Sequence, residues 1–373
     1  MSKISELKTL AHLILRRRFI IQLEMAWYDV PHIPLKKIWN YILIQFNRLF
    51  YIPRVLGMPY KLQVEPFFGC NLQCPGCPAI DPEAKRAKGP LDLDVYKKFI
   101  DAVGDYALFL RVWSWGEPLL HPRLPEMITY AKQKNIIVIT STNANVPRDD
   151  DYLRRLVASG LDMLIIAIDG VDQATYSAFR KKGQLERLID FTRRMVALKK
   201  DMGLREPILN LRMVVTRQNE HQITQLKKLA AELGVDILTL KTLNPSQDMK
   251  TVLFDIMPEE KKYHRYAVNE EEGTIVPRRR KRRCSFPWNQ ATLFSDGEIV
   301  GCEFDHQYLY PFGNLKDASF GEIWQGEAAH RFRRDYVKSR DSIEFCRLCP
   351  YQYMIPESCT VEKFVVGGQS PSV

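Results

Sequence analysis

The chain has 373 residues, of which 46% are hydrophobic and 26% are charged, and its formal net charge is +10. This length is too great for one ordinary core and predicts two domains with extensions. The apolar content is that of a folded globular protein and excludes a disordered chain. The excess of basic residues favours an anionic substrate or an anionic surface as the partner.

The first 55 residues carry two amphipathic segments. Apolar residues recur at near-helical spacing from Leu7 to Leu23, interrupted by Arg16 to Arg18, and a second helix is expected over Leu35 to Phe50. Neither segment has the roughly 18–20 uninterrupted apolar residues of a membrane span. The sequence leaves two interpretations open, namely helices docked on the rest of the protein and a basic amphipathic surface that contacts anionic lipid.

Three cysteines stand in one short loop just after the first expected strand, residues 61–67. Cys70, Cys74 and Cys77 have the spacing C-x3-C-x2-C. Three thiolates are one fewer than the irons of a [4Fe–4S] cluster, so a cluster held here would leave one iron open to another ligand. A zinc site is the alternative that the spacing leaves open.

Strand-like and helix-like runs alternate from residue 61 to about residue 245. Such alternation over six units predicts a parallel sheet. Strands are expected at 61–67, 107–113, 136–142, 163–169, 208–216 and 236–242. Helices are expected at 92–103, 124–134, 150–159, 184–200 and 222–233.

Further polar residues follow the next three expected strands. The string SWGEPLLHP, residues 114–122, follows the second strand, Asn143 follows the third, and Asp169 ends the fourth. Because the C-terminal ends of parallel strands meet at one end of a barrel, which is the active end in barrel enzymes, we expect these residues to lie close to the cysteine loop.

The other five of the eight cysteines all follow residue 283. Two isolated cysteines and a C-x2-C pair could supply four thiolates for zinc or an iron–sulfur cluster. Disulfides are not expected beside an iron–sulfur cluster, which belongs to a reducing compartment. A run of six cations, Arg278 to Arg283, comes just before; it is interpreted as a solvated linker or an interaction segment, and nucleic acid is not expected because no aromatic residue interleaves the run. The five cysteines are Cys284, Cys302, Cys346, Cys349 and Cys359.

Over roughly residues 60–355 the chain resembles the radical S-adenosylmethionine (SAM) superfamily. The resemblance implies an α/β fold, a partial (β/α)6 TIM-like barrel, with a [4Fe–4S] cluster on Cys70, Cys74 and Cys77 whose open iron binds SAM. It also departs from the family at Trp115, Ala167 and Gly76, where a glycine, a serine and an aromatic residue are usual. The implied SAM contacts are Trp115, Gly116, Glu117, Asn143, Asp169 and Arg180.

The C-terminal region resembles the SPASM/twitch extension of that family. The matching pieces are Cys284, Gly297-x4-Cys302, residues 313–326 and the Cys346–Cys349 pair. The resemblance implies one auxiliary [4Fe–4S] cluster on Cys284, Cys302, Cys346 and Cys349, with Cys359 left over. The expected organisation is an N-terminal helical extension (1–58), a radical SAM barrel (59–250), a basic linker (251–283) and the auxiliary-cluster domain (284–373).

These features together imply an enzyme that cleaves SAM reductively to a 5′-deoxyadenosyl radical, which abstracts a hydrogen atom from a substrate. A small or lipid-linked anionic metabolite is the expected substrate, with dehydrogenation, epimerisation or C–C bond formation as outcome. The alternatives are a peptide- or protein-modifying maturase and, from another class, a non-enzymatic metal-binding protein. A low-potential electron donor such as flavodoxin or ferredoxin is implied, and the expected location is the cytoplasm, with peripheral contact at the inner membrane surface through the N-terminal segment as an option.

Overall fold

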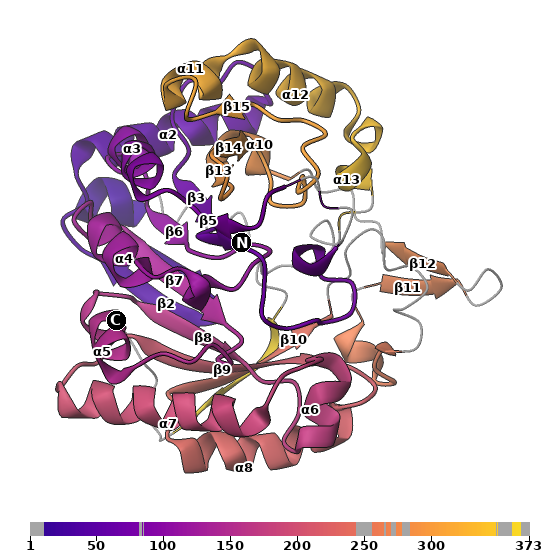
Figure 1. The fold of residues 1–373 in the computed structure, drawn as a ribbon. Helices are drawn as coiled ribbons and strands as arrows, with labels where there is room; N and C mark the ends of the chain where they lie inside the picture. Colours follow the sequence, from indigo (N-terminus) through magenta and orange to yellow (C-terminus); the bar gives the residue numbers. More distant parts are fainter. Residues whose placement is uncertain are drawn as a thin grey trace.

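The computed structural model describes residues 11–81, 84, 86–243, 256–264, 266–269, 274–277, 284–347, 349 and 360–366. Six parallel strands form its centre, and each pairs with the next one along the chain, as the alternating sequence predicts (Figure 1). Across the sheet they are β3 (Lys61–Val64), β6 (Phe109–Arg111), β7 (Ile137–Thr142), β8 (Met163–Ala167), β9 (Ile208–Val215) and β10 (Ile237–Thr242).

Helices cover the outer side of these strands, and all but α6 (Gln173–Phe179) begin within one residue of the predicted start. At α5 the side chain of Asp149 accepts a hydrogen bond from the backbone N–H of Tyr152, which satisfies one of the free donors at the helix start. Gly160, with a φ of 80°, follows the helix end. The helices are α3 (Leu93–Val103), α4 (Leu124–Lys132), α5 (Asp150–Ala158), α6 (Gln173–Phe179), α7 (Leu185–Asp201) and α8 (Ile223–Leu233).

The C-terminal segment lengthens this sheet at both edges, which the sequence did not predict. β13 (Gln290–Leu293) pairs in parallel with β3, and β14 (Glu298–Val300) and β15 (Gly313–Asn314) continue the sheet beyond it. At the other edge β16 (Thr360–Val365) pairs antiparallel with β10. Within the described residues the sheet therefore has ten strands, and both edges of the six-stranded barrel are paired.

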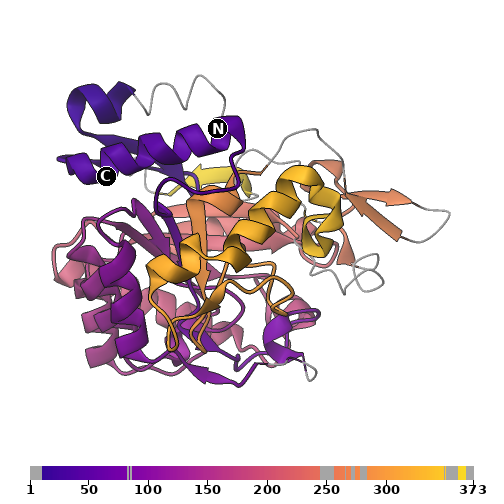
Figure 2. The same cartoon turned by 90° about the horizontal axis from the view of Figure 1, so that it is seen from above.

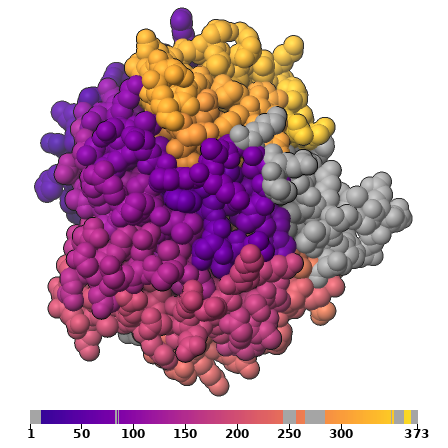
Figure 3. Space-filling model, viewed as in Figure 1, coloured from indigo at the N-terminus to yellow at the C-terminus, as the bar shows by residue number. Residues whose placement is uncertain are grey.

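The remaining elements surround the sheet. In the space-filling view the C-terminal residues pack directly on the first part of the barrel (Figure 3), and the Trp324 indole donates a hydrogen bond to the carbonyl of Gly57. These elements are β4 (Phe67–Phe68), β5 (Gly89–Pro90), β11 (Tyr266–Asn269), β12 (Thr274–Pro277), α10 (Phe286–Asn289), α11 (Phe320–Gln325), α12 (Glu327–Lys338) and α13 (Glu344–Arg347), with short 3-10 turns at Pro78–Ile80, Pro118–Leu120, Glu220–Gln222, Lys261–Tyr263 and Arg340–Ser342.

The N-terminal segment forms a β-hairpin where the spacing predicted a continuous helix. Residues 11–16 are helical, but β1 (Phe19–Leu23) and β2 (Ala26–Val30) pair antiparallel. Glu24 and Met25, with φ of 48° and 67°, make the two-residue turn between them. Alternate residues of β1 are buried, as in a strand with one buried face. Apolar residues four positions apart lie on one face of a helix and also on one face of a strand, so the apolar pattern alone did not distinguish the two structures.

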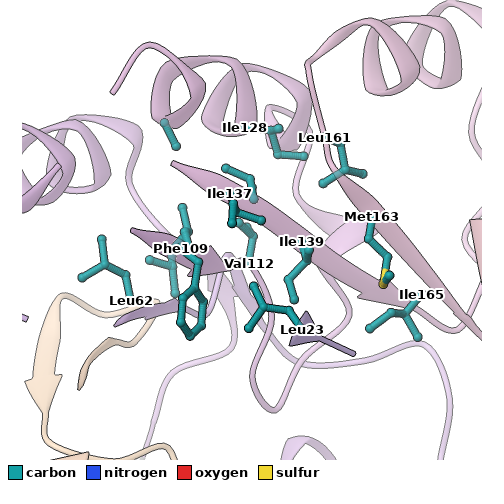
Figure 4. Packing of buried hydrophobic residues seen from close by; sticks show 14 of the residues in the cluster. Leu23, Leu62, Phe109, Val112, Ile128, Ile137, Ile139, Leu161, Met163 and Ile165 are labelled. Atoms are coloured by element: carbon teal, nitrogen blue, oxygen red, sulfur yellow. The ribbon is translucent and has the colours of Figure 1, made fainter. Parts of the chain in front are cut away.

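The tip of this hairpin lies inside the barrel. Figure 4 shows Leu23 among the inward side chains of Ile139, Met163 and Ile165. Beyond it, the carboxylate of Glu24 lies 2.7 Å from the guanidinium of Arg212. The hairpin therefore fills part of the barrel interior with both apolar and charged groups.

Helix α2 (Leu35–Phe50) is docked across the N-terminal ends of the barrel strands (Figure 2). Its buried Lys37 donates hydrogen bonds to the carbonyls of Ala107, Lys134 and Asn135, at 2.6, 2.6 and 3.0 Å, and these residues precede β6 and β7. Within the described part of the chain, no helix is both long and apolar enough to cross a membrane.

Candidate active site

The cysteine loop lies at the C-terminal end of the first barrel strand, against the loop that carries Gly116. A Cβ atom on Gly116 would lie 1.7 Å from the carbonyl oxygen of Phe67, so only glycine permits this contact. The backbone N–H of Glu117 donates to the carbonyl of Gly69 at 3.0 Å. This close backbone approach holds Cys70 beside the loop that follows the second strand.

Glu117 joins the ends of the second and third barrel strands. Its buried carboxylate accepts hydrogen bonds from the backbone N–H of Leu119, the hydroxyl of Thr142 and the backbone N–H of Asn143, at 2.9, 2.7 and 2.8 Å. Burial raises the pKa of Glu117, and these three donors oppose that rise. A carboxylate has about four lone-pair positions, so one remains for a further donor; the methionine ammonium of SAM stays our prediction for it.

Asn143 and Cys70 are in direct contact, as the strand-end argument predicts. The Asn143 amide donates to the Cys70 sulfur at 3.4 Å and to the Asn71 side-chain oxygen at 3.0 Å. The backbone N–H of Leu72 donates to the same sulfur at 3.4 Å. Two N–H groups therefore point at this thiol, an arrangement that stabilises a thiolate once it forms.

Arg180 connects two other predicted site residues. Its Nε atom lies 2.5 Å from the carboxylate of Asp169, and its Nη1 atom lies 3.7 Å from the sulfur of Cys74. Asp169 is buried and also accepts the backbone N–H of Val214 at 2.7 Å. Arg180 therefore connects the cysteine loop to the end of the fourth strand.

The thiols of Cys70 and Cys77 need a nearby positive charge to ionise near neutral pH. Burial raises the pKa of Cys70 to about 12, with the Glu117 carboxylate adding to the rise, and burial raises the pKa of Cys77 to about 11. The positive charge of a bound metal favours loss of the thiol proton, so cysteines that bind iron do so as thiolates. A loop of three half-buried thiols, with N–H donors directed at the sulfurs of Cys70 and Cys74, fits an iron–sulfur cluster.

A second group of four cysteines surrounds one mostly apolar pocket in the C-terminal domain. Among the residues that the structure describes, no three His, Cys, Asp or Glu side chains are gathered as ligands of a single metal ion. Four thiolates around one pocket can hold zinc or an iron–sulfur cluster. The pocket is lined by Cys284, Cys302, Cys346 and Cys349 with Phe286, Pro287, Gly301, Phe332, Tyr336, Arg340 and Phe345.

Burial also raises the pKa of Cys302 and of Cys346 well above the ordinary value for a thiol. The backbone N–H of Phe286 donates to the Cys284 sulfur at 3.4 Å. These four cysteines are the predicted auxiliary set brought together in space. The remaining predicted features, Cys359 and the cations Arg278 to Arg283, lie outside the described residues.

Trp115 bridges the two cysteine sites, a role that the sequence did not reveal. Its indole N–H donates to the carbonyl oxygen of Glu303 at 2.8 Å, and its ring packs edge-on against Phe304 and His306. Glu303 directly follows Cys302. The only signal in the sequence is the tryptophan itself, which stands where a glycine is usual in the family.

A buried ion pair makes a second connection to the C-terminal domain. Arg86 pairs with Glu65 through two hydrogen bonds of 2.7 and 3.2 Å, and its guanidinium stacks on Phe68 and Phe294, 3.8 and 4.3 Å from the ring centroids. Glu65 also accepts the backbone N–H of Ser295 at 3.4 Å. This pair was not predicted from the sequence; the signal that could have found it is Glu65, an acid directly after a buried strand.

A six-stranded parallel (β/α) barrel with a three-cysteine loop at its active end, joined to a second cysteine-lined domain, defines an iron–sulfur barrel enzyme. Residues 64–230 match the radical SAM superfamily, and residues 284–350 match SPASM, an iron–sulfur cluster-binding domain. The chain belongs to the radical SAM superfamily and carries a C-terminal SPASM domain. Its barrel binds a [4Fe–4S] cluster and SAM, and its SPASM domain binds further iron–sulfur cluster cofactors.

Three similar proteins show the range of the relatives. A tungsten-containing aldehyde ferredoxin oxidoreductase cofactor-modifying protein of Pyrococcus furiosus is 24% identical over 71% of this chain and 80% of its own length. The mycofactocin maturase MftC of Mycobacterium tuberculosis is 22% identical over 84% of this chain and 81% of its own. The crystal structure of Streptococcus suis SuiB bound to S-adenosylmethionine has a TM-score of 0.59 at 13% identity, and the match covers 96% of this chain and 88% of SuiB. This last likeness shows the fold.

Proposed function

We propose that the enzyme abstracts a hydrogen atom from an anionic substrate held in the barrel. Cys70, Cys74 and Cys77 would hold the SAM-binding cluster. The reduced cluster with SAM bound supplies a 5′-deoxyadenosyl radical, the species that takes the hydrogen atom. The observation that carries the proposal is the meeting of the cysteine loop with Glu117, Asn143, Asp169 and Arg180 at one end of the barrel.

The chain's own residues would position SAM rather than react. The backbone around Trp115 and Gly116, with the carboxylate of Glu117, would receive the methionine ammonium, and Arg180 would receive the methionine carboxylate. Asp169 orients Arg180 through its 2.5 Å hydrogen bond. Fixed partners of this kind hold reacting groups at bonding distance, which accounts for much of enzymatic rate and selectivity.

The interior charge of the barrel favours a negatively charged substrate. The carboxylate of Glu24 is held in its ionised form, because Arg212, Arg111 and Lys241 lower its pKa against the effect of burial. Three cations thus face one carboxylate inside the barrel, on inward positions of three strands. Positive charge in a low-dielectric interior attracts an anionic group strongly.

The C-terminal domain would place a second redox centre near the same substrate. We assign one auxiliary [4Fe–4S] cluster to Cys284, Cys302, Cys346 and Cys349, which share one pocket. The indole hydrogen bond from Trp115 to Glu303 places the segment after Cys302 beside the SAM-binding loop. A protein-bound cluster there could accept the electron that the substrate radical loses when it is oxidised to the product. The initial electron would come from a low-potential donor such as flavodoxin or ferredoxin, in the reducing cytoplasm.

A peptide or protein substrate is the alternative class, because the similar protein MftC is a maturase that matches 84% of this chain and the similar structure SuiB is bound to a precursor peptide. The two classes can be separated with anaerobic cell extract as the source of substrate. Extract is fractionated on an anion-exchange resin, and each fraction is tested for stimulation of 5′-deoxyadenosine formation above the uncoupled rate.

Stimulating activity that binds the resin and survives protease treatment would support an anionic metabolite. Activity that protease destroys would overturn that choice in favour of the peptide. Activity found solely in the unbound fraction would overturn the anionic character of the substrate.

A further inference from the structure

Large apolar side chains are exposed almost entirely in one part of the described chain. Nine of the twelve exposed large hydrophobic residues lie between residues 14 and 56. Soluble proteins expose single apolar residues routinely, but a gathered set marks an interaction surface. The nine are Ile14, Leu15, Trp27, Leu35, Trp39, Phe46, Leu49, Phe50 and Leu56.

Helix α2 carries the centre of this set on the side that faces away from the barrel. Leu35, Trp39 and Leu49 are 69%, 63% and 70% exposed, and Phe46 and Phe50 lie on the same stripe because residues three or four apart share a helix face. We call these five residues the outer face of α2. Figure 2 shows α2 and the N-terminal hairpin as a layer at one side of the molecule.

The opposite side of α2 is fixed to the protein by polar contacts, so the outer face is held outward. The amide of Asn40 exchanges hydrogen bonds of 2.9 and 2.7 Å with the backbone of Met58. Asn47 accepts the N–H of Leu56 at 2.7 Å and donates to the carbonyl of Arg54 at 2.8 Å. Together with the buried Lys37, these contacts would be lost if the helix turned to bury its outer face.

The helix that carries the outer face has cations and no acidic residue of its own. No Asp or Glu occurs between Asp29 and Glu65, a stretch that contains the whole of α2. Exposed arginines follow the apolar pair Ile14 and Leu15, at positions 16–18, and Arg54 is exposed beyond the end of the helix. Two neighbouring cations are paired with acids from other segments, Lys36 with Asp105 and Arg18 with Asp29. An apolar stripe with tryptophan on a helix that carries cations and no acid of its own is the pattern of a helix that lies in the interface of an anionic lipid bilayer.

We propose that the outer face of α2 docks on the surface of a membrane that contains anionic lipid. The helix would lie parallel to the membrane plane, with Trp39 and its apolar neighbours at the level of the headgroups. Because α2 covers the N-terminal ends of the barrel strands, the active site at their C-terminal ends would face the aqueous side. The substrate would then reach the enzyme from solution, and docking would concentrate the enzyme at the membrane without blocking the barrel mouth.

Vesicle co-sedimentation of the full chain tests this proposal. Phosphatidylcholine vesicles with and without about 30% phosphatidylglycerol separate apolar insertion from charge attraction. We expect binding to the anionic vesicles, weakened as salt rises because the Debye length shortens. The double variant Trp39→Ser/Phe46→Ser should lower the bound fraction at least about fivefold.

The matched control is Leu204→Ser/Leu309→Ser, which removes two apolar side chains of comparable exposure outside the N-terminal layer. It should bind vesicles as the wild type does, and both double variants should keep wild-type SAM cleavage. No binding to either kind of vesicle, or equal loss in the control, would overturn the proposal. A self-associated wild type that becomes monomeric in Trp39→Ser/Phe46→Ser, without vesicle binding, would assign the face to a second copy instead.

Discussion

The indole nitrogen of Trp115 lies 2.8 Å from the carbonyl oxygen of Glu303 and so ties the loop after the second barrel strand to the segment after Cys302. This side chain is one of the direct connections between the barrel and the domain that holds the second cysteine site. A glycine at position 115 could not make this connection. The tryptophan is a departure from the family pattern that the structure explains.

Trp115→Phe should loosen this connection with little change in the SAM site. The ring contacts remain, but the Glu303 carbonyl loses its donor, so the free energy of unfolding should fall by about 1 kcal/mol. Uncoupled SAM cleavage should stay within about twofold of the wild type, since no predicted SAM contact of the side chain depends on the indole N–H. Urea unfolding measures the first effect, and Trp27→Phe, at an exposed position, is the control. Equal stability of Trp115→Phe and the wild type would contradict the assigned role.

Arg180→Gln should weaken SAM binding and also leave Asp169 as a buried charge without its partner. We expect SAM affinity to fall at least about tenfold, because a charge-assisted hydrogen bond to the methionine carboxylate is lost. Stability should fall by about 3 kcal/mol, since removing one partner of a buried pair leaves the other uncompensated.

The double variant Arg180→Gln/Asp169→Asn separates these two effects. It should recover much of the stability, because no buried charge remains, but not the affinity for SAM. Equilibrium dialysis with SAM measures the affinity of the reconstituted protein, and denaturant unfolding of the apo-protein measures its stability. Recovery of SAM binding in the double variant would argue against Arg180 as a ligand-binding residue.

Lys37 should give the stability of the protein a specific dependence on pH. Burial lowers the pKa of Lys37 to about 7, whereas the unfolded chain holds this proton up to about pH 10.4. Between these values the unfolded state binds more protons, so stability rises with pH, by at most about 1.4 kcal/mol per unit from this group.

The free-energy difference between the wild type and Lys37→Met, measured from pH 6 to pH 10, isolates this contribution. The wild type should gain stability relative to the variant as pH rises above about 7. A difference that does not change with pH would show that the three carbonyl partners of Lys37 keep it protonated in the folded state.

Cys302→Ala should remove the auxiliary cluster alone. Iron content should fall by about four atoms per chain, because the other three cysteines of the pocket no longer form a complete set. Uncoupled SAM cleavage should persist, since the barrel loop is intact. Iron analysis with the 5′-deoxyadenosine assay tests both statements, and unchanged iron content would show that Cys302 is not a ligand.

The sequence predicted the barrel well because its strands and helices obey local rules. All six parallel strands lie where apolar runs were found, and α5 starts at the predicted acids and ends before Gly160. Asn143 contacts the cysteine loop directly, and Asp169 is connected to it through Arg180. The reason is topological, since parallel strands end at the same side of the sheet.

The features that the sequence missed depend on contacts between distant segments. The hairpin at Glu24 and Met25 satisfies a helical spacing as well as a strand spacing, and what selects the strand is packing inside the barrel. The pairing of β13 with β3 and the contact of Trp115 with Glu303 join residues about 190 to 230 positions apart, for which no local pattern exists.

Anaerobic reconstitution of the wild type and of Cys74→Ala tests the central claim most directly, with iron and sulfide counted and 5′-deoxyadenosine measured after addition of dithionite and SAM. We predict about eight irons per chain for the wild type, as two [4Fe–4S] clusters require, and formation of 5′-deoxyadenosine. Cys74→Ala should remain folded, retain about four irons on the auxiliary site and form no 5′-deoxyadenosine. SAM cleavage at the wild-type rate in Cys74→Ala, or zinc in place of iron without cleavage in the wild type, would contradict the account.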